Sequence, residues 1–144
     1  VNVDVSTIYK GYVSDSSRMF CIGEVSEEKK KLVQVTKECV ELGLEQVKPW
    51  NFLGDMAQVI NDHAKANGYS VVVDIGGHGV GLEIHEAPRL SPIIDNVLEG
   101  GTIVTVEPGI YIPDLGGVRI ENMVIVTKDG GVSMNDTPTD LIVL

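Results

Sequence analysis

The chain has 144 residues, of which 43% are hydrophobic and 22% charged, as expected for one folded domain that buries a core. Its formal net charge of −10 argues against a nucleic-acid partner, because such binding needs a basic surface that displaces counterions from phosphates. No apolar stretch reaches membrane-spanning length, so no membrane contact is expected. The two cysteines have neither a disulfide nor a zinc-ribbon spacing, which favours a cytoplasmic location.

Two paired strands are expected first. Residues 1–5 alternate valine with polar residues, the two-residue period of a half-buried strand. Lys10-Gly11 then turns the chain, and residues 12–21 form the second strand of a predicted hairpin. In that hairpin Asp15 would face Asp4.

Two helices are expected next. Ser26 is the predicted N-cap of the first, and two glutamates follow in the first turn, where the helix dipole favours acids. Apolar residues then recur at helical spacing until Pro49 ends the helix. A second helix is predicted over residues 53–67, with Gly68 at the position of a C-terminal cap.

The rest of the chain is expected to consist mainly of strands. A short β-branched strand is predicted over residues 70–75, and a region rich in glycine and proline follows it. Further strands are predicted over 102–106 and 118–127, with a last short strand over 139–144. Because helices and strands occur in separate runs, the fold class is α+β, in a single domain over residues 1–144.

Four carboxylates stand out by their positions. Asp4, Glu107 and Glu121 lie within or at the end of apolar strands, where an unpaired charge is costly, and Asp15 lies on the predicted hairpin. Any one of these acids alone is most simply explained as a salt-bridged structural group. Several buried carboxylates repel one another unless cations lie between them, so the set together favours a metal site.

His78 lies among glycines in the segment 76–81, where small residues allow close backbone approach and leave the imidazole free. These residues alone leave open whether His78 is a metal ligand or an ordinary loop histidine. Four carboxylates and one imidazole suit paired divalent ions, and Mn, Co, Fe and Zn are all permitted. The glycines lack the lysine of a phosphate-binding loop, and His85-Glu86 lacks the second histidine of a zinc-protease helix.

Six segments resemble, in the same order, those of the pita-bread metallopeptidases, which include methionine aminopeptidases, Xaa-Pro aminopeptidases and prolidases. The segments are Val3-Asp4-Val5, residues 11–18, residues 77–81, His85-Glu86-Ala87-Pro88, Val106-Glu107-Pro108-Gly109 and Val118-Arg119-Ile120-Glu121. The resemblance implies the C-terminal half of that fold, a curved, mostly antiparallel sheet with two long helices on one face. It also implies that the chain is a catalytic half-domain without the preceding half, which supplies the other wall of the substrate cleft.

The resemblance further implies a role for each site residue. Two divalent ions would be held by five metal ligands, namely Asp4, Asp15, His78, Glu107 and Glu121. Asp15 and Glu121 would bridge the ions, Glu107 would also shuttle the proton, and His78 would belong to the catalytic set. His85 would contact the scissile carbonyl, and Arg119 and Tyr111 would support it on the substrate side.

The segments around His85 and Glu107 look like those of Xaa-Pro peptidases, whereas residues 1–54 look more like certain bacterial methionine aminopeptidases. The leading hypothesis is hydrolysis of the N-terminal peptide bond of short Xaa-Pro peptides, by a water that two cations, for example manganese, make nucleophilic. The alternatives are a methionine aminopeptidase with the same site and an isolated half-domain that binds metal without turnover.

A protein partner is also expected. Without the preceding half, an apolar sheet face or a strand edge of the hairpin would be exposed, which monomers rarely tolerate. A homodimer would replace the absent wall, because a twofold pair mimics the similarity between the two halves of the fold. A separate chain that carries the N-terminal half would serve equally.

Overall fold

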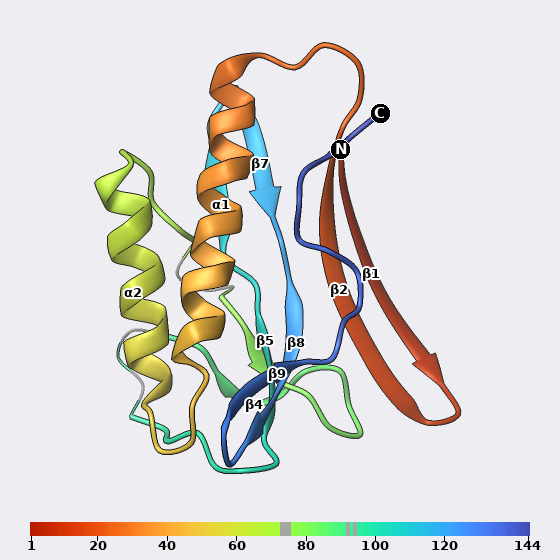
Figure 1. The fold of residues 1–144 in the computed structure, drawn as a ribbon, viewed down its shortest axis with the longest axis vertical. Helices are drawn as coiled ribbons and strands as arrows, with labels where there is room; N and C mark the ends of the chain where they lie inside the picture. Colours follow the sequence, from red (N-terminus) through yellow and green to blue (C-terminus); the bar gives the residue numbers. More distant parts are fainter. Residues whose placement is uncertain (73–75, 92, 94) are drawn as a thin grey trace.

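The computed structural model of the chain describes residues 1–72, 76–91, 93 and 95–144. Two helices form one layer against an antiparallel sheet, and a long hairpin stands on the other side of the molecule (Figure 1). This arrangement confirms the predicted α+β class with its two helices on one face. No helix in the described ranges combines the length and the apolar character that crossing a bilayer requires.

The predicted hairpin is present and longer than expected. Strands β1 (Asn2–Tyr9) and β2 (Tyr12–Cys21) pair antiparallel along the whole of β1 and as far as Met19 of β2. Lys10 and Gly11 between them both have positive φ, 52° and 85°, as a tight two-residue hairpin turn requires. The short strand β10 (Ile142–Val143) pairs in parallel with β2, within the predicted range 139–144.

The half-burial predicted for the first strand is wrong. Every residue of β1 is exposed, whereas β2 buries Asp15, the run 17–19 and Cys21. β1 is an edge strand, and its partner β2 makes the contacts with strands β7 (Gly116–Arg119) and β8 (Asn122–Thr127). Alternating valines therefore indicated a strand correctly, but they carry no information on whether that strand lies at an edge.

Both predicted helices are confirmed. Helix α1 (Glu27–Gln46) begins after Ser26 and ends before Pro49. Ser26 has the extended backbone of an N-cap, but its side chain makes no capping hydrogen bond. Helix α2 (Leu53–Ala66) is one residue shorter than predicted, and Gly68 follows it with a φ of 84°.

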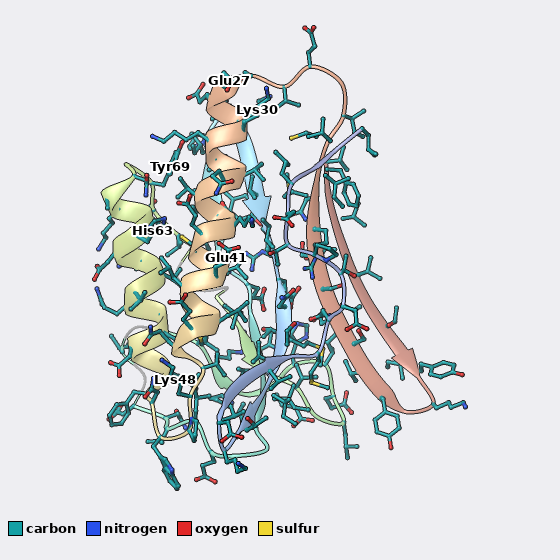
Figure 2. All side chains as sticks on the ribbon, viewed as in Figure 1. Glu27, Lys30, Glu41, Lys48, His63 and Tyr69 are labelled. Atoms are coloured by element: carbon teal, nitrogen blue, oxygen red, sulfur yellow. The ribbon has the colours of Figure 1, made fainter. Side chains whose placement is uncertain are left out.

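The two helices touch through an apolar contact and a polar one. At Gly43 of α1, an added Cβ would lie 2.8 Å from both Ile60 of α2 and Val106, so the missing side chain is what allows this close approach. Nearer the surface, the Nε2 atom of His63 on α2 lies 2.8 Å from a carboxylate oxygen of Glu38 on α1 (Figure 2, His63 labelled).

The remaining strands form one five-stranded antiparallel sheet and one separate hairpin. The sheet has the order β4 (Glu86–Arg89), β3 (His78–Gly79), β5 (Ile103–Val106), β8 (Asn122–Thr127) and β9 (Gly130–Ser133). The hairpin consists of β6 (Gly109–Ile112) and β7 (Gly116–Arg119).

Two strand predictions differ from the structure. The strand predicted over 118–127 is divided into β7 and β8, because Glu121 between them leaves the sheet and pairs with Ser17 of β2. The amide of Glu121 donates to the Ser17 carbonyl at 3.1 Å. Of the strand predicted over 70–75, residues 73–75 lie outside the described residues, and Val71 forms an isolated bridge with Ile110.

The apolar core lies between the helices and the sheet. Its most completely buried side chains come from both layers and include Leu32, Val40, Leu53, Met56, Val104, Val106, Ile110, Ile120 and Val124. Apart from Thr36 of α1, the buried polar and charged side chains come from the strands and the segments that join them. These buried polar groups define the candidate site.

Candidate metal centre

Three of the predicted metal ligands converge on one buried point. Asp15 comes from β2, His78 from β3, and Glu121 from the link between β7 and β8. One ligand atom of each lies within 4.8 Å of the other two, and all three residues are buried. The distance from His78 Nε2 to Asp15 Oδ2 is 3.8 Å.

Glu107 joins this group from the end of β5. One carboxylate oxygen, Oε1, lies 3.2 Å from His78 Nε2 and accepts a hydrogen bond from the Thr105 hydroxyl at 2.9 Å. The other oxygen, Oε2, accepts from Arg119 Nη1 at 2.6 Å. Glu107 is buried, and each of its two carboxylate oxygens accepts a hydrogen bond from a protein group. The oxygen Oε1 is the one that lies beside His78.

Asp4 lies at the exposed side of the group. The sequence predicted that Asp15 faces Asp4. The strand register instead pairs Asp4 with Ser17 and Asp15 with Ser6, so the two acids are not directly opposite each other. They still project from the same sheet face, because Asp15 is two residues from Ser17 along β2. Partial burial raises the pKa of the Asp4 carboxyl, and the charges of Asp15 and Glu107 raise it further.

Glu121 is the most strongly perturbed acid of the group. Its side chain is buried, and Oε1 has no hydrogen-bond partner among the described residues. Burial is the first cause that raises its pKa to about 9, and the charges of Glu107, Asp15 and Asp4 add to it. A buried carboxylate oxygen without a donor is costly unless a cation or a water occupies the space beside it.

This environment fits a divalent cation. One oxygen of Glu121 has no protein donor in the described part of the chain, and a carboxylate oxygen of Glu121 lies within 4.8 Å of ligand atoms from Asp15 and His78. Carboxylate oxygens with one imidazole nitrogen form a donor set that suits Mn, Co, Fe or Zn. A cation at this point would also relieve the mutual repulsion of the carboxylates, which contributes to the raised pKa of Glu121.

The backbone around His78 sets the direction of its imidazole. The ring atom Nδ1 lies 3.0 Å from the Gly79 carbonyl oxygen, which can only accept, so Nδ1 donates to it and the other ring nitrogen, Nε2, points toward the carboxylates of Asp15 and Glu107. Metal-binding histidines commonly donate their other ring nitrogen in this way. A Cβ on Gly77 would lie 2.4 Å from the Thr105 carbonyl oxygen, and one on Gly79 would lie 2.3 Å from that of Ala87. The close backbone approach expected from the glycines is therefore present.

The residues assigned to the substrate side lie around the edge of this group. The exposed ring of His85 has its centroid 4.4 Å from that of His78. Arg119 donates from Nε to the Tyr111 hydroxyl at 3.3 Å, and its guanidinium lies over the Tyr111 ring. Gly117 makes room for this arrangement, because a Cβ there would lie 2.0 Å from the Tyr111 ring.

Several supporting residues were not identified from the sequence. Thr105 bonds Glu107, and the Ser6 hydroxyl donates to Asp15 Oδ1 at 2.9 Å. The Arg18 guanidinium is buried and donates to the backbone carbonyl of Glu121. Thr105 could have been found, because a polar residue in an apolar strand, two positions from Glu107, must share the face of that acid.

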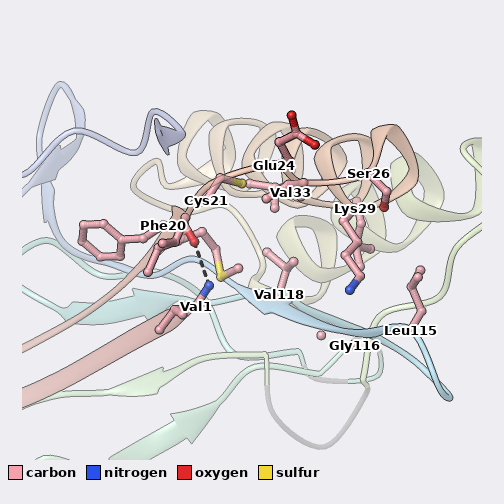
Figure 3. A pocket seen from close by; sticks show the side chains of 15 residues that line it. Val1, Phe20, Cys21, Glu24, Ser26, Lys29, Val33, Leu115, Gly116 and Val118 are labelled. Carbon is pink, nitrogen blue, oxygen red and sulfur yellow. Dashed lines mark hydrogen bonds between the residues drawn. The ribbon is translucent and has the colours of Figure 1, made fainter. Parts of the chain in front are cut away.

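A cavity of about 450 Å³ lies apart from this centre, between the end of β2, the start of α1 and β7 (Figure 3). Its walls are mainly apolar and include Met19, Leu32 and Val118, with Glu24 and Lys29 as charged members. None of the predicted site residues lines it.

Residues 1–128 match metallopeptidase family M24, and the chain belongs to that family. The resemblance drawn from the six sequence segments is thereby confirmed. The fold agrees as well, because the described elements superimpose on prolidases of the pita-bread fold.

Named relatives come from both branches suggested by the sequence. The chain is 36% identical over 143 residues to the Xaa-Pro dipeptidase of Pyrococcus furiosus, and the aligned region covers 99% of this chain and 41% of the relative. It is 40% identical over 139 residues to methionine aminopeptidase A of Synechocystis sp., covering 92% and 54% respectively. The solved structure of the Xaa-Pro dipeptidase from Bacillus anthracis matches with a TM-score of 0.91 at 40% identity, over 99% of this chain and 41% of that one. The chain thus spans about two fifths of the length of these dipeptidases.

Proposed function

We propose that the chain carries the dinuclear metal centre of an exopeptidase that hydrolyses the N-terminal peptide bond of short Xaa-Pro peptides. The observation that carries this proposal is the buried group of Asp15, His78 and Glu121, in which one carboxylate oxygen of Glu121 has no hydrogen-bond partner among the described residues. Buried acids at this separation repel one another, and a cation between them would remove that repulsion.

The proposed ligands are the five residues predicted from the sequence: Asp4, Asp15, His78, Glu107 and Glu121. Bound divalent cations would supply a lowered pKa for water and a positive charge that polarises a carbonyl group. The protein prepares this set in advance, because Arg119 holds one oxygen of Glu107 and Gly79 orients the His78 ring.

Glu107 is the proposed proton carrier. Its Oε1 atom lies on the His78 side of the carboxylate, and the bonds from Thr105 and Arg119 keep it there. A carboxylate fixed in this way can take a proton at one position and return it to the leaving nitrogen at the same position. His85 is exposed beside His78 and is the proposed hydrogen-bond donor to the scissile carbonyl of the substrate.

The proline preference rests on the two dipeptidase relatives and on the Xaa-Pro character of the segments around His85 and Glu107. Methionine aminopeptidase activity is the second candidate, favoured by the 40% identity to the Synechocystis enzyme. A cytoplasmic location is part of the proposal, because Cys21 and Cys39 are both free and buried.

Metal titration and peptide turnover test these assignments together. The chain is freed of metal with a chelator, titrated with Mn²⁺ by calorimetry, and then given a Xaa-Pro dipeptide and a methionine-initiated peptide. Binding of two ions with cleavage of the proline peptide supports the proposal, and cleavage of the methionine peptide alone transfers it to the second candidate. Ion binding without cleavage identifies a metal-binding half-domain without turnover.

A matched pair of variants shows whether the ions occupy the proposed centre. Asp15→Asn removes one buried ligand charge, and Glu45→Gln removes an exposed charge of α1 that lies outside the site. Mn²⁺ affinity should fall in the first variant and stay unchanged in the second. Equal affinity in both would place the ions elsewhere.

A further inference from the structure

Thr105 is a completely buried polar residue in an otherwise apolar strand. It lies in β5, with a relative exposure of 0%, between Val104 and Val106 of the core. Its neighbour across the sheet is Met123 of β8. A hydroxyl group at such a position costs free energy unless both its donor and its acceptor capacity are used.

The Thr105 hydroxyl links two segments of the candidate centre. Its oxygen accepts a hydrogen bond from the backbone amide of His78 at 2.9 Å, and it donates to Glu107 Oε1, also at 2.9 Å. Because an amide can only donate, the single hydroxyl proton must point at the carboxylate. The backbone of His78 therefore determines the direction in which Thr105 holds Glu107.

The second oxygen of Glu107 is held independently by Arg119, at 2.6 Å. With one bond on each oxygen, the carboxylate has a fixed rotation as well as a fixed position. That rotation places Oε1 at 3.2 Å from His78 Nε2. Thr105 thus contacts the backbone of His78 and the side chain of Glu107, both of which are proposed ligands.

We propose that Thr105 is a positioning residue, whose hydroxyl fixes the Glu107 carboxylate relative to the His78 imidazole and so preorganises this pair for metal. The inference rests on the proposed function, in which both residues are ligands. Groups that orient ligands typically change metal affinity by about 10–100-fold when they are removed. The hydroxyl of Thr105 is in direct contact with Glu107 and with the backbone of His78, so the same range is expected.

A buried threonine can also serve a purely structural purpose, and the chain contains one that does. Thr36 of α1 has a relative exposure of 0%, and its hydroxyl donates to the Leu32 carbonyl at 2.8 Å within the same helix. Thr36→Val is therefore a matched control for Thr105→Val. Both changes replace a buried hydroxyl by a methyl group, but only one of them touches the proposed ligands.

The experiment uses Thr105→Val, which removes the hydroxyl, and Thr105→Ser, which retains it. Mn²⁺ alone is titrated into each metal-free chain by calorimetry. Thr105→Val should bind Mn²⁺ about 10–100-fold more weakly than wild type. Thr105→Ser should recover most of the loss, and Thr36→Val should bind as wild type does. A Thr105→Val chain with wild-type affinity, or a Thr105→Ser chain as weak as Thr105→Val, overturns the proposal.

A second measurement needs no metal and separates this inference from the proposed function. In chelator, NMR follows hydrogen exchange of the His78 amide and the ¹⁵N shifts of its ring. Thr105→Val should lose amide protection and shift the ring signals, and Thr105→Ser should restore both. Unchanged signals in Thr105→Val refute the positioning role, even if wild type binds Mn²⁺. Should wild type bind no Mn²⁺, the proposed function fails while the NMR result still decides on Thr105.

Thr105→Cys replaces Thr105→Val in both measurements if the valine variant does not fold. Its thiol occupies similar space and is only a weak donor, so the same losses are expected. Wild-type behaviour of Thr105→Cys would then count against the proposal.

Discussion

Replacing Glu121 by glutamine should make the metal-free chain more resistant to unfolding as the pH rises. Burial, followed by the charges of Glu107, Asp15 and Asp4, raises the pKa of the Glu121 carboxyl from its ordinary 4.5 to about 9. In the unfolded chain the carboxyl ionises near its ordinary value. Between these two pH values the folded chain holds a proton that the unfolded chain has released.

The free energy of unfolding must therefore fall as the pH rises. The contribution of protonated Glu121 is fully present below about pH 4.5 and is lost progressively up to about pH 9. One proton corresponds to about 1.4 kcal/mol per pH unit, so wild type should lose on the order of 3 kcal/mol relative to Glu121→Gln between about pH 6 and pH 8. In a chain of this size that difference is roughly 6–12 °C in Tm.

Urea unfolding in a chelator at several pH values measures this difference. Wild type and Glu121→Gln are compared with Glu45→Gln, which changes an exposed acid and should keep the wild-type slope. Equal pH slopes for wild type and Glu121→Gln would refute the reasoning. With Mn²⁺ added, the order should reverse, because wild type gains stability by mass action and the variant loses a ligand.

Three further predictions concern contacts around and beyond the centre. Arg119→Met should destabilise the chain by about 3–5 kcal/mol in urea unfolding, because it leaves the buried Glu107 carboxylate without its partner. The hydrogen bonds from Gln34 and His63 lower the pKa of Glu38, so their stabilisation is present above its ordinary 4.5 and is lost as the pH falls. Because the side chains of Glu38 and His63 are partly exposed, His63→Gln should lower the free energy of unfolding by less than about 1 kcal/mol at neutral pH. The homodimer expected from the sequence stays a prediction, and sedimentation at micromolar concentration tests it, with a stable monomer as the contrary result.

Local signals predicted the elements that depend on neighbouring residues. The turn at Lys10-Gly11 and the helix ends near Pro49 and Gly68 each follow from the backbone preferences of one or two residues. Three acids of the proposed ligand set, Asp4, Glu107 and Glu121, were likewise conspicuous, because they lie within or at the end of apolar strands, whereas the full set of five was predicted from the family resemblance. Metal binding by that set remains a prediction that the titrations above address.

Features that depend on distant contacts could not be predicted in this way. The exposure of Asp4 follows from the edge position of β1, which the strand's own sequence does not encode. The break between β7 and β8 follows from the pairing of Glu121 with Ser17, which lies in a remote part of the chain. Thr105 is not itself a proposed ligand, and its role follows from the contacts that its hydroxyl makes with His78 and Glu107.

The pairing of Glu121 with the Ser17 region has a consequence for folding kinetics. The contact between Arg18 and the Glu121 backbone spans 103 positions, and the candidate centre exists only once a loop of that size has closed. Closing so large a loop costs entropy, and we expect the centre to acquire its precise geometry only after the rate-limiting step of folding. An ion that binds there should consequently leave the folding rate unchanged and slow the unfolding rate. Stopped-flow measurements with and without Mn²⁺ would then show a change in the unfolding arm of the chevron and none in the folding arm. In that case the ion stabilises the fold after it has formed and does not direct its formation.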